Sequence, residues 1–361
     1  MKIAVIGAGP AGSYTAYLLA KKGYSVSVYE KNPVIGKPVQ CTGILSDYFL
    51  TLMTPSKKFV QNIVTKTRIY APNGRFVETK IKKNYVICRK KFDNYLAELA
   101  KKQHVKYYLN HSFKSCKEGK QLQIKLNNKG KTITKKVDIL IGADGPNSQV
   151  AKSAGLFGKR KFVIGTQIEA QAKTDNLVEF YPYIGSYAWV VPVTKNSVRI
   201  GVAAYRNTPA LFKKFVNEKL GNNYKKIENQ SGIISTFNPR VKAQKNNVYL
   251  VGEAATFVKA TSGGGINQSL KSAMILAECI QKNKNYNLAW KTKLFKNLYT
   301  HLILHKMMEK FSNKDWNYLI EVFSKPKMKS VLYSESRDNI VKMLIKIAFT
   351  EPRLFKFLKY L

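Results

Sequence analysis

Three glycines near the N-terminus have the spacing of a phosphate-binding turn. Gly7, Gly9 and Gly12 directly follow the apolar run Lys2–Ile6. In such a turn the first glycine makes a tight bend, the second lets the backbone approach a pyrophosphate, and the third lets a helix pack on a strand. Glu30 follows Gly12 by 18 positions, and a carboxylate there accepts hydrogen bonds from a ribose diol. These four residues predict a dinucleotide site.

The elements that must position this turn are a strand on one side and a helix on the other. The pattern predicts a helix over Ser13–Lys22 and a second strand over Tyr24–Tyr29, with Glu30 at its end. The N-terminus of the helix supplies unpaired N–H groups and partial positive charge to the phosphates.

Two later segments place a glycine and an acidic residue directly after an apolar run. Gly142–Gly145 reads Gly-Ala-Asp-Gly, and Glu253 follows the strand predicted over Val248–Val251. A further glycine run ends at Gly265 and precedes a helix predicted near Asn267–Gln281. Each segment has the form of a turn at the end of a buried strand.

Together these turns resemble the fingerprints of the FAD-dependent group that includes aromatic hydroxylases, halogenases and geranylgeranyl reductases. That group usually has Gly-Asp where this chain has Glu253, and the longer carboxylate is expected to accept a ribityl hydroxyl. Backbone groups at Gly265 and Ile266 are expected at the flavin carbonyl edge. Arg89 matches the arginine that meets the FAD phosphates, with a solvated charge at a helix start as the alternative. Phe113 lies where a backbone group meets the adenine, with an ordinary core position as the alternative.

The resemblance implies FAD as the cofactor and a set of residues that contact it. These are Gly7, Gly9, Ala11, Gly12, Glu30, Cys41, Thr42, Gly43, Arg89, Phe113, Glu253, Gly265 and Ile266.

Two segments narrow the resemblance to the geranylgeranyl reductases. The first places Cys41 before Thr42 and Gly43, similar to the reductase segment in which a cysteine before glycines lies against the flavin. The family often has glycine where this chain has Thr42. Cys41 is therefore the candidate catalytic residue, as a thiol that shapes or protonates the site, and a buried structural cysteine is the alternative.

The second segment combines two aromatic residues with strand alternation. Tyr187, Trp189 and Val191 alternate along one predicted strand and so share one face. They resemble the reductase motif Tyr-x-Trp-x-Phe-Pro, with Val191 in place of Phe. A flat apolar surface suits a polyprenyl chain, whereas a plain core face is the other interpretation. Flavin halogenases carry a similar Trp-x-Trp-x-Ile-Pro, and the tyrosine at the first position favours the reductase.

The resemblance covers about the first three-quarters of the chain and implies an activity. It is that of an FAD-dependent reductase of isolated prenyl double bonds, acting on ether lipids of the archaeal type. A prenylated lipid would be the substrate, and NADPH, NADH or ferredoxin the electron donor. In such a reaction the reduced flavin supplies a hydride to one alkene carbon, and an acid, Cys41 or an ordered water, supplies a proton to the other. A flavin monooxygenase or halogenase acting on an aromatic and a basic RNA-binding flavoprotein are the rival interpretations.

The expected fold class is α/β. A Rossmann-type FAD-binding domain is predicted from residues 1–45, 85–160 and 245–284. An inserted antiparallel-sheet substrate domain, like that of p-hydroxybenzoate hydroxylase, is predicted from residues 46–84 and 161–244. Residues 285–361 are predicted to form a helical C-terminal region.

Composition excludes several classes of protein. The 361 residues are 45% hydrophobic, enough to bury a core, and the four cysteines are too scattered to form a disulfide framework. No apolar run reaches the roughly 18 residues of a membrane span, so we expect a cytoplasmic protein. His301, His305 and Glu309 share one helical face, but a hydrogen-bonded helix face is the preferred interpretation, and no metal is expected.

The net charge of +41 is spread along the chain, and only nine of its 62 cations are arginine. Two explanations of this charge are open: a lysine bias of the whole proteome, or an anionic partner that the charge attracts. No nucleic-acid-binding motif is visible, so we do not expect nucleic acid to be that partner. The basic amphipathic patterns over Asn339–Phe349 and Thr350–Leu361 fit either peripheral contact with an anionic membrane or packing on the catalytic domain.

Overall fold

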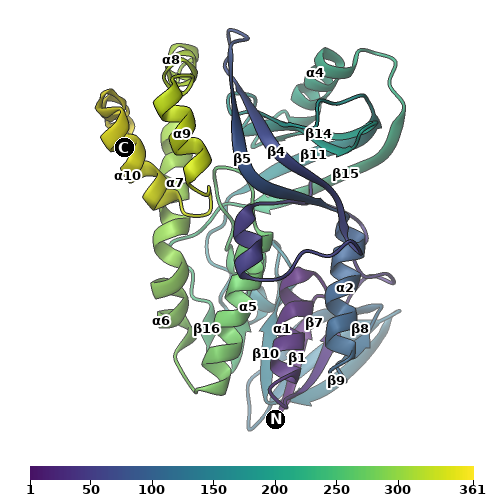
Figure 1. Cartoon of the computed structure of the whole chain (residues 1–361). Helices are drawn as coiled ribbons and strands as arrows, with labels where there is room; N and C mark the ends of the chain where they lie inside the picture. The colour runs from purple at the N-terminus through teal and green to yellow at the C-terminus, as the bar shows by residue number, and fades with distance from the viewer.

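The N-terminal strand lies at the centre of a six-stranded sheet, in a computed structural model that describes residues 1–361 (Figure 1). The strand order is β16-β17-β10-β1-β2-β6, and all pairs except β16–β17 are parallel. The strands are β1 (Lys2–Ile6), β2 (Ser25–Tyr29), β6 (Lys106–Tyr108), β10 (Ile139–Gly142), β16 (Gln244–Lys245) and β17 (Val248–Leu250). Because β1, β10 and β17 run in the same direction, the glycine turns that follow them meet at one edge of the sheet.

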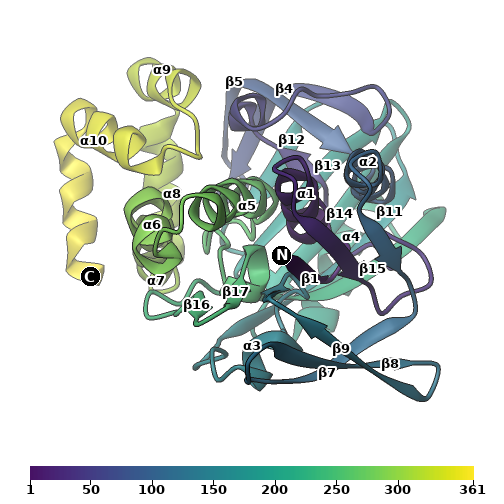
Figure 2. The same cartoon turned by 90° about the horizontal axis from the view of Figure 1, so that it is seen from below.

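Helices cover one face of this sheet and a small antiparallel sheet covers the other (Figure 2). The helices are α1 (Pro10–Ala20), α2 (Arg89–Lys101) and α5 (Ile266–Gln281). The small sheet consists of β7 (His111–Lys117), β8 (Leu122–Asn128) and β9 (Lys131–Val137), and the short helix α3 (Gln149–Ser153) packs beside it.

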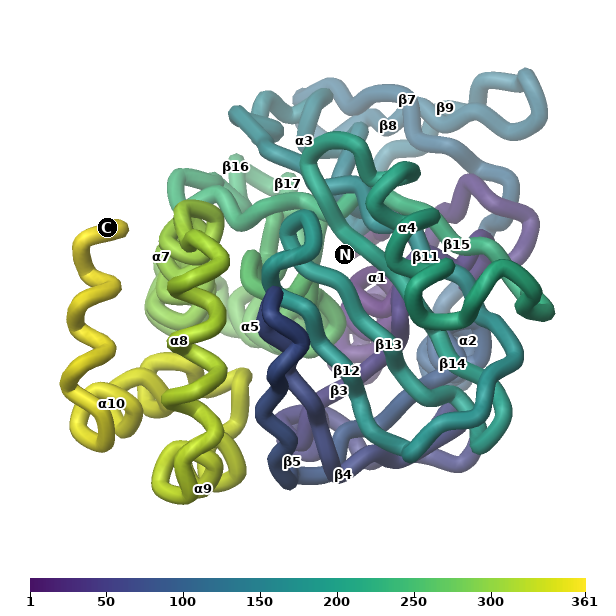
Figure 3. The backbone as a smooth tube through the Cα atoms, turned by 90° about the horizontal axis from the view of Figure 1, so that it is seen from above, coloured from purple at the N-terminus to yellow at the C-terminus, as the bar shows by residue number.

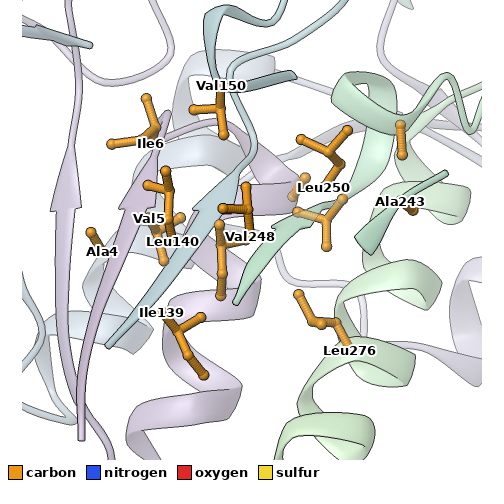
Figure 4. Packing of buried hydrophobic residues seen from close by; sticks show 14 of the residues in the cluster. Ala4, Val5, Ile6, Ile139, Leu140, Val150, Ala243, Val248, Leu250 and Leu276 are labelled. Atoms are coloured by element: carbon orange, nitrogen blue, oxygen red, sulfur yellow. The ribbon is translucent and has the colours of Figure 1, made fainter. Parts of the chain in front are cut away.

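The main hydrophobic core lies between these layers. Val5, Leu140 and Val248 come from three adjacent parallel strands and are fully buried, together with Leu276 of α5 (Figure 4). Strands that are buried on both faces have continuous apolar sequences, which is why these short strands could be predicted from the sequence.

A second, eight-stranded sheet lies above the first, in the order β15-β11-β14-β13-β12-β4-β5-β3. Its strands are β3 (Ile44–Leu45), β4 (Val60–Tyr70), β5 (Phe76–Ile87), β11 (Phe162–Gln171), β12 (Val178–Tyr181), β13 (Tyr187–Thr194), β14 (Ser197–Ala204) and β15 (Lys226–Ser235). All its pairs are antiparallel except β12–β4, and α4 (Thr208–Leu220) packs against β14 and β11. The predicted antiparallel sheet is thus confirmed, with one parallel pair added; the exact domain boundaries stay a prediction.

The C-terminal region is helical, as predicted, and stands beside both sheets (Figure 3). It consists of α6 (Tyr286–Trp290), a π-helical turn (Lys291–Phe295), α7 (Lys296–Met308), α8 (Asn313–Phe323), α9 (Pro326–Ser334), α10 (Ile340–Thr350) and a terminal 3₁₀ segment, η4 (Pro352–Tyr360). Helices α8 and α9 contact β5 of the upper sheet. None of the helices has the length and apolar character needed to cross a membrane.

Candidate active site

The glycine turn after β1 packs directly on the turn after β10. Gly7 has a φ of +102°, and a Cβ there would lie 2.5 Å from the carbonyl oxygen of Ala143. A Cβ at Gly12 would lie 1.9 Å from the carbonyl oxygen of Gly7. The protein's own packing therefore requires glycine at both positions.

Gly9 differs from its two neighbours. Its φ of −72° is open to any residue, and a Cβ there would meet no protein atom within 4 Å. Gly9 is the N-cap of α1 and supplies no side-chain hydrogen bond, so no capping side chain occupies the N-terminus of the helix. Neither backbone strain nor packing explains the glycine, whereas close approach of a pyrophosphate does. This part of the site fits the phosphates of FAD.

Glu30 lies beside the turn, as predicted. Its Oε2 accepts a hydrogen bond from the Ala8 N–H at 2.8 Å and its Oε1 one from the Asn32 N–H at 2.8 Å. The Glu30 N–H donates to the carbonyl oxygen of Tyr108, and the His111 N–H donates to the carbonyl oxygen of Glu30. These two bonds place the segment before Phe113 next to Glu30. Phe113 itself buries its side chain in the main core, so only its backbone is left for the predicted adenine contact.

The second fingerprint begins with the tight turn Gly252–Ala255 (η2). Gly252 has a φ of +59°, and a Cβ there would lie 2.8 Å from the Cβ of Ala11. Glu253 accepts hydrogen bonds from the N–H and hydroxyl of Ser235 with Oε1, at 2.8 and 3.3 Å, while Oε2 accepts none within the protein. Burial raises the pKa of Glu253. The free Oε2 leaves this carboxyl able to bond a hydroxyl of the cofactor, in keeping with the expected ribityl contact.

Arg89 begins α2 and is not a solvated charge. Its guanidinium forms an ion pair with Asp93 at 3.0 Å, and both side chains are largely buried. Burial works to lower the pKa of Arg89, but the Asp93 carboxylate and the neighbouring Cys41 side chain raise it above its ordinary value. Arg89 therefore stays cationic and lies next to the cysteine segment. Sequence reasoning missed Asp93, although a carboxylate four residues on in a helix is the usual partner of an arginine.

The Cys41–Gly43 segment is held by contacts from the upper sheet. Gly43 donates its N–H to the Cys41 thiol at 3.4 Å, and the Thr42 hydroxyl donates to Oε1 of Gln167 at 2.8 Å. Arg199 donates to the carbonyl oxygens of Thr42 and Ile87 at 2.7 and 3.0 Å. The position of the thiol is thus set by residues more than a hundred positions away in the chain.

Sequence reasoning also missed Arg199 and Gln167. Arg199 is only 4% exposed within the apolar strand β14, and it forms an ion pair with Glu169 at 3.0 Å. A charged residue inside an otherwise apolar strand has to be paired when it is buried, and that was the available signal. Gln167 carried no comparable signal.

Tyr187, Trp189 and Val191 share one face of β13, and we call these three residues the substrate wall after the role predicted for them from the sequence. Tyr187 and Val191 are buried in two neighbouring clusters, and Trp189 packs against both. Gly201 on the adjacent strand makes room for the indole, because a Cβ there would lie 2.4 Å from its ring. The indole N–H donates to Oε1 of Gln167 at 3.1 Å, the same atom that receives the hydrogen bond from Thr42.

The substrate wall also meets the glycine run before α5. Gly263 has a φ of +63°, and a Cβ there would lie 2.2 Å from the Tyr187 hydroxyl oxygen. That hydroxyl is buried without a hydrogen-bond partner, and burial raises the pKa of Tyr187. A small cavity between β13, β15 and this run is lined by Tyr187, Ile234 and Lys259, among others. Gly265 caps α5 and Ile266 begins it, so the predicted flavin-edge turn borders the substrate wall.

The C-terminal region anchors the same glycine run. Lys259 forms an ion pair with Asp338 at 2.7 Å, with exposed side-chain fractions of 6% and 0%. Asp338 also accepts a hydrogen bond from the hydroxyl of Ser46. Ser46 directly follows β3, the short strand that comes after Gly43. Although burial opposes the charged form, Lys259 and Ser46 hold the pKa of Asp338 at about 2. No sequence motif had assigned a role to this region.

The histidine pair of α7 is buried and hydrogen-bonded. Nδ1 of His301 lies 2.8 Å from the Thr261 hydroxyl, and Nε2 of His305 lies 3.0 Å from the Tyr205 hydroxyl. Burial, with Lys259 nearby, lowers the pKa of His301 to about 3, so this ring is neutral. No group of three or more metal-binding side chains gathers anywhere in the chain.

A surface hollow of about 390 Å³ lies elsewhere. It is lined by Met1, Asp138 and Asn247, which precede β1, β10 and β17. Ligands of parallel α/β sheets bind at the carboxyl ends of the strands, and this hollow is at their amino ends. We therefore assign the site to the opposite edge, where the glycine turns converge.

Comparison with known proteins identifies the class first. The chain belongs to the FAD-binding domain family, whose model matches residues 1–284. FAD is accordingly its cofactor, as the sequence predicted.

The individual relatives are more specific. The chain is 28% identical to a digeranylgeranylglycerophospholipid reductase of Methanocaldococcus jannaschii, over 99% of this chain and 97% of that protein. It is 27% identical to digeranylgeranylglycerophospholipid reductase 2 of Methanopyrus kandleri, over 99% and 98%. The predicted resemblance to geranylgeranyl reductases is thereby confirmed, and it extends through the C-terminal region.

Solved structures support the fold. A geranylgeranyl bacteriochlorophyll reductase-like protein of Thermoplasma acidophilum superposes with a TM-score of 0.87 at 22% identity, over 99% of this chain and 98% of that one. A flavin-dependent halogenase is more distant, with a TM-score of 0.69 at 14% identity, over 98% of this chain and 78% of that one.

Proposed function

We propose that this protein is an FAD-dependent reductase that saturates isolated double bonds of geranylgeranyl chains in ether membrane lipids of the archaeal type. The observation that carries the proposal is the shared hydrogen-bond acceptor of Thr42 and Trp189, Oε1 of Gln167. It joins the cysteine segment to the substrate wall, the two segments whose sequences resemble those of geranylgeranyl reductases. The reductase names of the near-full-length relatives support the same activity.

In this proposal the FAD-binding residues act mainly through charge and backbone groups. The N-terminus of α1 at Gly9 and the cationic Arg89 would hold the phosphates, Glu30 the ribose, and Glu253 the ribityl chain. Gly265 and Ile266, at the start of α5, would meet the flavin ring. Bound FAD, once reduced, supplies the hydride for the alkene.

The substrate wall positions the prenyl chain. Tyr187 and Val191 are buried and Trp189 is half-buried, so the Trp189 indole is the part of the wall that would contact the prenyl chain, and the two buried side chains support it without adding charge. An unactivated alkene has no carbonyl to polarise, so the protein contributes by holding the double bond in a near-attack position. Because Gln167 fixes both Trp189 and Thr42, the wall and the thiol keep a constant relation to each other.

Cys41 is the candidate proton donor, together with an ordered water. Its thiol lies beside the Arg89 guanidinium and is bonded to the Gly43 N–H, so its orientation is defined. The carbon of the former double bond that does not receive the hydride would accept this proton.

The electron donor and the location belong to the same proposal. NADPH, NADH or ferredoxin would reduce the flavin. Because the substrate is a membrane lipid, the protein would act while in peripheral contact with an anionic membrane.

The decisive experiment is anaerobic incubation of the dithionite-reduced protein with geranylgeranyl lipids, followed by mass spectrometry. We expect the mass to rise by 2 Da for each reduced double bond. A hydroxylated or halogenated product formed in the presence of oxygen, with alkenes unchanged, would instead assign the protein to the flavin monooxygenases or halogenases.

A further inference from the structure

The terminal 3₁₀ segment η4 divides its side chains among three edges. A helix with three residues per turn places residues i and i+3 on the same edge. The first edge consists of Leu354, Phe357 and Tyr360 and faces the protein. Phe357 is 5% exposed, with its ring 4.8 Å from that of Phe311, and the Tyr360 hydroxyl donates to Asp315 at 2.8 Å. This edge fastens the segment to the end of α7 and the start of α8.

The second edge consists of Arg353, Lys356 and Lys359, and all three side chains are exposed. Arg353 forms an ion pair with Glu351 at 2.5 Å. The two lysines have no carboxylate partner; the ammonium groups lie over aromatic rings of Tyr318 and Tyr360. From residue 352 to the terminus the chain contains no acidic residue at all. We call this set the basic edge.

The third edge consists of Phe355 and Leu358, and the same spacing continues to Leu361. Their exposed fractions are 54%, 52% and 68%. We call these three residues the apolar edge. Directly before it, Phe349 at the end of α10 is 85% exposed. The segment lies at the outer margin of the molecule in two views (Figures 2 and 3), and the exposed fractions show that other elements leave this edge uncovered.

We propose that the apolar edge inserts into the headgroup region of an anionic lipid bilayer while the basic edge binds the lipid phosphates. A row of exposed aromatic and aliphatic side chains beside a row of unpaired lysines is the pattern of a segment that lies in the membrane plane. The net charge of +41 attracts the whole protein to an anionic surface, and it repels a second copy of this chain. The inference rests on the proposed function, because a lipid-reducing enzyme has to reach its substrate in the bilayer.

A tryptophan reporter tests insertion directly. In holoenzyme carrying Phe355→Trp, we expect a blue-shifted emission and quenching by lipids brominated high on the acyl chain, in vesicles of phosphatidylglycerol and phosphatidylcholine. Leu288→Trp is the matched control, because Leu288 in α6 is 66% exposed but lies outside η4. Equal quenching of the two reporters, or none at Phe355→Trp, would overturn the proposal.

Vesicle flotation separates the two edges. Phe355→Ser/Leu358→Ser/Leu361→Ser should lower binding to the same vesicles at least tenfold, whereas diffuse attraction by charge alone predicts no change and would refute insertion. Lys356→Gln/Lys359→Gln should weaken binding about 30-fold, the equivalent of about 1 kcal/mol per lysine. If the triple variant instead abolishes a dimer of the free protein, the edge is an interface between copies and the proposal fails.

A second readout keeps this inference separate from the proposed function. Reduction of a detergent-dispersed geranylgeranyl substrate should be unchanged in the triple variant, because the apolar edge is not part of the site. If the unaltered protein lacks that activity, the proposed reductase function is refuted. The vesicle-binding measurements would still test whether the apolar edge inserts into the membrane.

Discussion

Thr42 and Trp189 donate hydrogen bonds to one and the same atom, Oε1 of Gln167, at 2.8 and 3.1 Å. Thr42 follows the candidate catalytic Cys41, and Trp189 is the centre of the substrate wall. One carboxamide oxygen therefore sets the relation between the thiol and the surface on which a prenyl chain would lie.

Gln167→Leu removes this acceptor and leaves a half-buried hydroxyl and a half-buried indole N–H unpaired. We expect a loss of about 1–3 kcal/mol in the free energy of unfolding. We also expect slower alkene reduction with FAD still bound, because Gln167 contacts none of the glycine turns and reaches the predicted FAD-contacting residues through Thr42. Combining the change with Trp189→Phe in a double-mutant cycle should give clear non-additivity; additive effects would show that the shared bond couples nothing.

Gly9→Val is expected to abolish FAD binding without unfolding the protein. A Cβ at this position meets no protein atom within 4 Å, so the added side chain obstructs only the cofactor phosphates. Gly12→Ala is the contrasting control: its Cβ would lie 1.9 Å from the Gly7 carbonyl oxygen, so it should fail to fold. Flavin absorbance and circular dichroism of both variants test the difference, and a Gly9→Val protein that purifies with stoichiometric FAD would disprove the assignment.

Trp189→Ala should reduce prenyl turnover far more than flavin affinity. The change removes roughly 150–250 Å² of aromatic surface from the substrate wall, which lies on the upper sheet and not in a glycine fingerprint. The measurement compares the rate of alkene reduction with the dissociation constant for FAD. A parallel loss of both would place Trp189 in the cofactor site instead.

Cys41→Ser nearly preserves volume but changes acidity and polarizability. If the thiol supplies the proton or sets how the chain lies on the flavin, reduction should slow or shift to different double bonds. Flavin reduction by dithionite should stay normal, since the thiol takes no part in it. An unchanged rate and product distribution would leave Cys41 with a packing role and assign the proton to water.

Asp338→Ala should be strongly destabilising. It leaves the buried Lys259 ammonium without its partner, which typically costs about 3–5 kcal/mol. Replacing both residues, in Lys259→Met/Asp338→Leu, should recover most of that loss because no buried charge remains. Chemical denaturation of the two variants measures the difference, and equal stabilities would mean that the pair is not buried in solution.

The same pair predicts how stability depends on pH. The pKa of Asp338 is about 2 in the folded protein against an ordinary 3.8, so its contribution is present above about pH 4. It is lost as the pH falls toward 2, and the difference amounts to about 2 kcal/mol. Asp338→Asn should show a flatter decline of stability between pH 4 and pH 2; an identical slope would contradict the assignment.

The sequence by itself largely determined the cofactor and the glycine turn in which we predict that FAD binds. Gly7, Gly9, Gly12 and Glu30 are close in the chain, and a strand, a turn and a helix in succession leave few ways to arrange them. Their chemistry is local, so type and spacing carried the information. The shared face of Tyr187, Trp189 and Val191 could also be predicted from the sequence, because alternation is a property of a single strand.

Only the tertiary structure decided what joins these parts. Gln167 and Arg199 both bind Thr42, which lies 125 and 157 positions away from them in the chain. Asp338 pairs with Lys259, which is 79 positions away. Nothing in a one-dimensional pattern specifies which glutamine or carboxylate faces a given partner, because such contacts depend on how two sheets and a helical region pack together. The burial of these polar groups makes the contacts obligatory, and burial is a property of the folded chain alone.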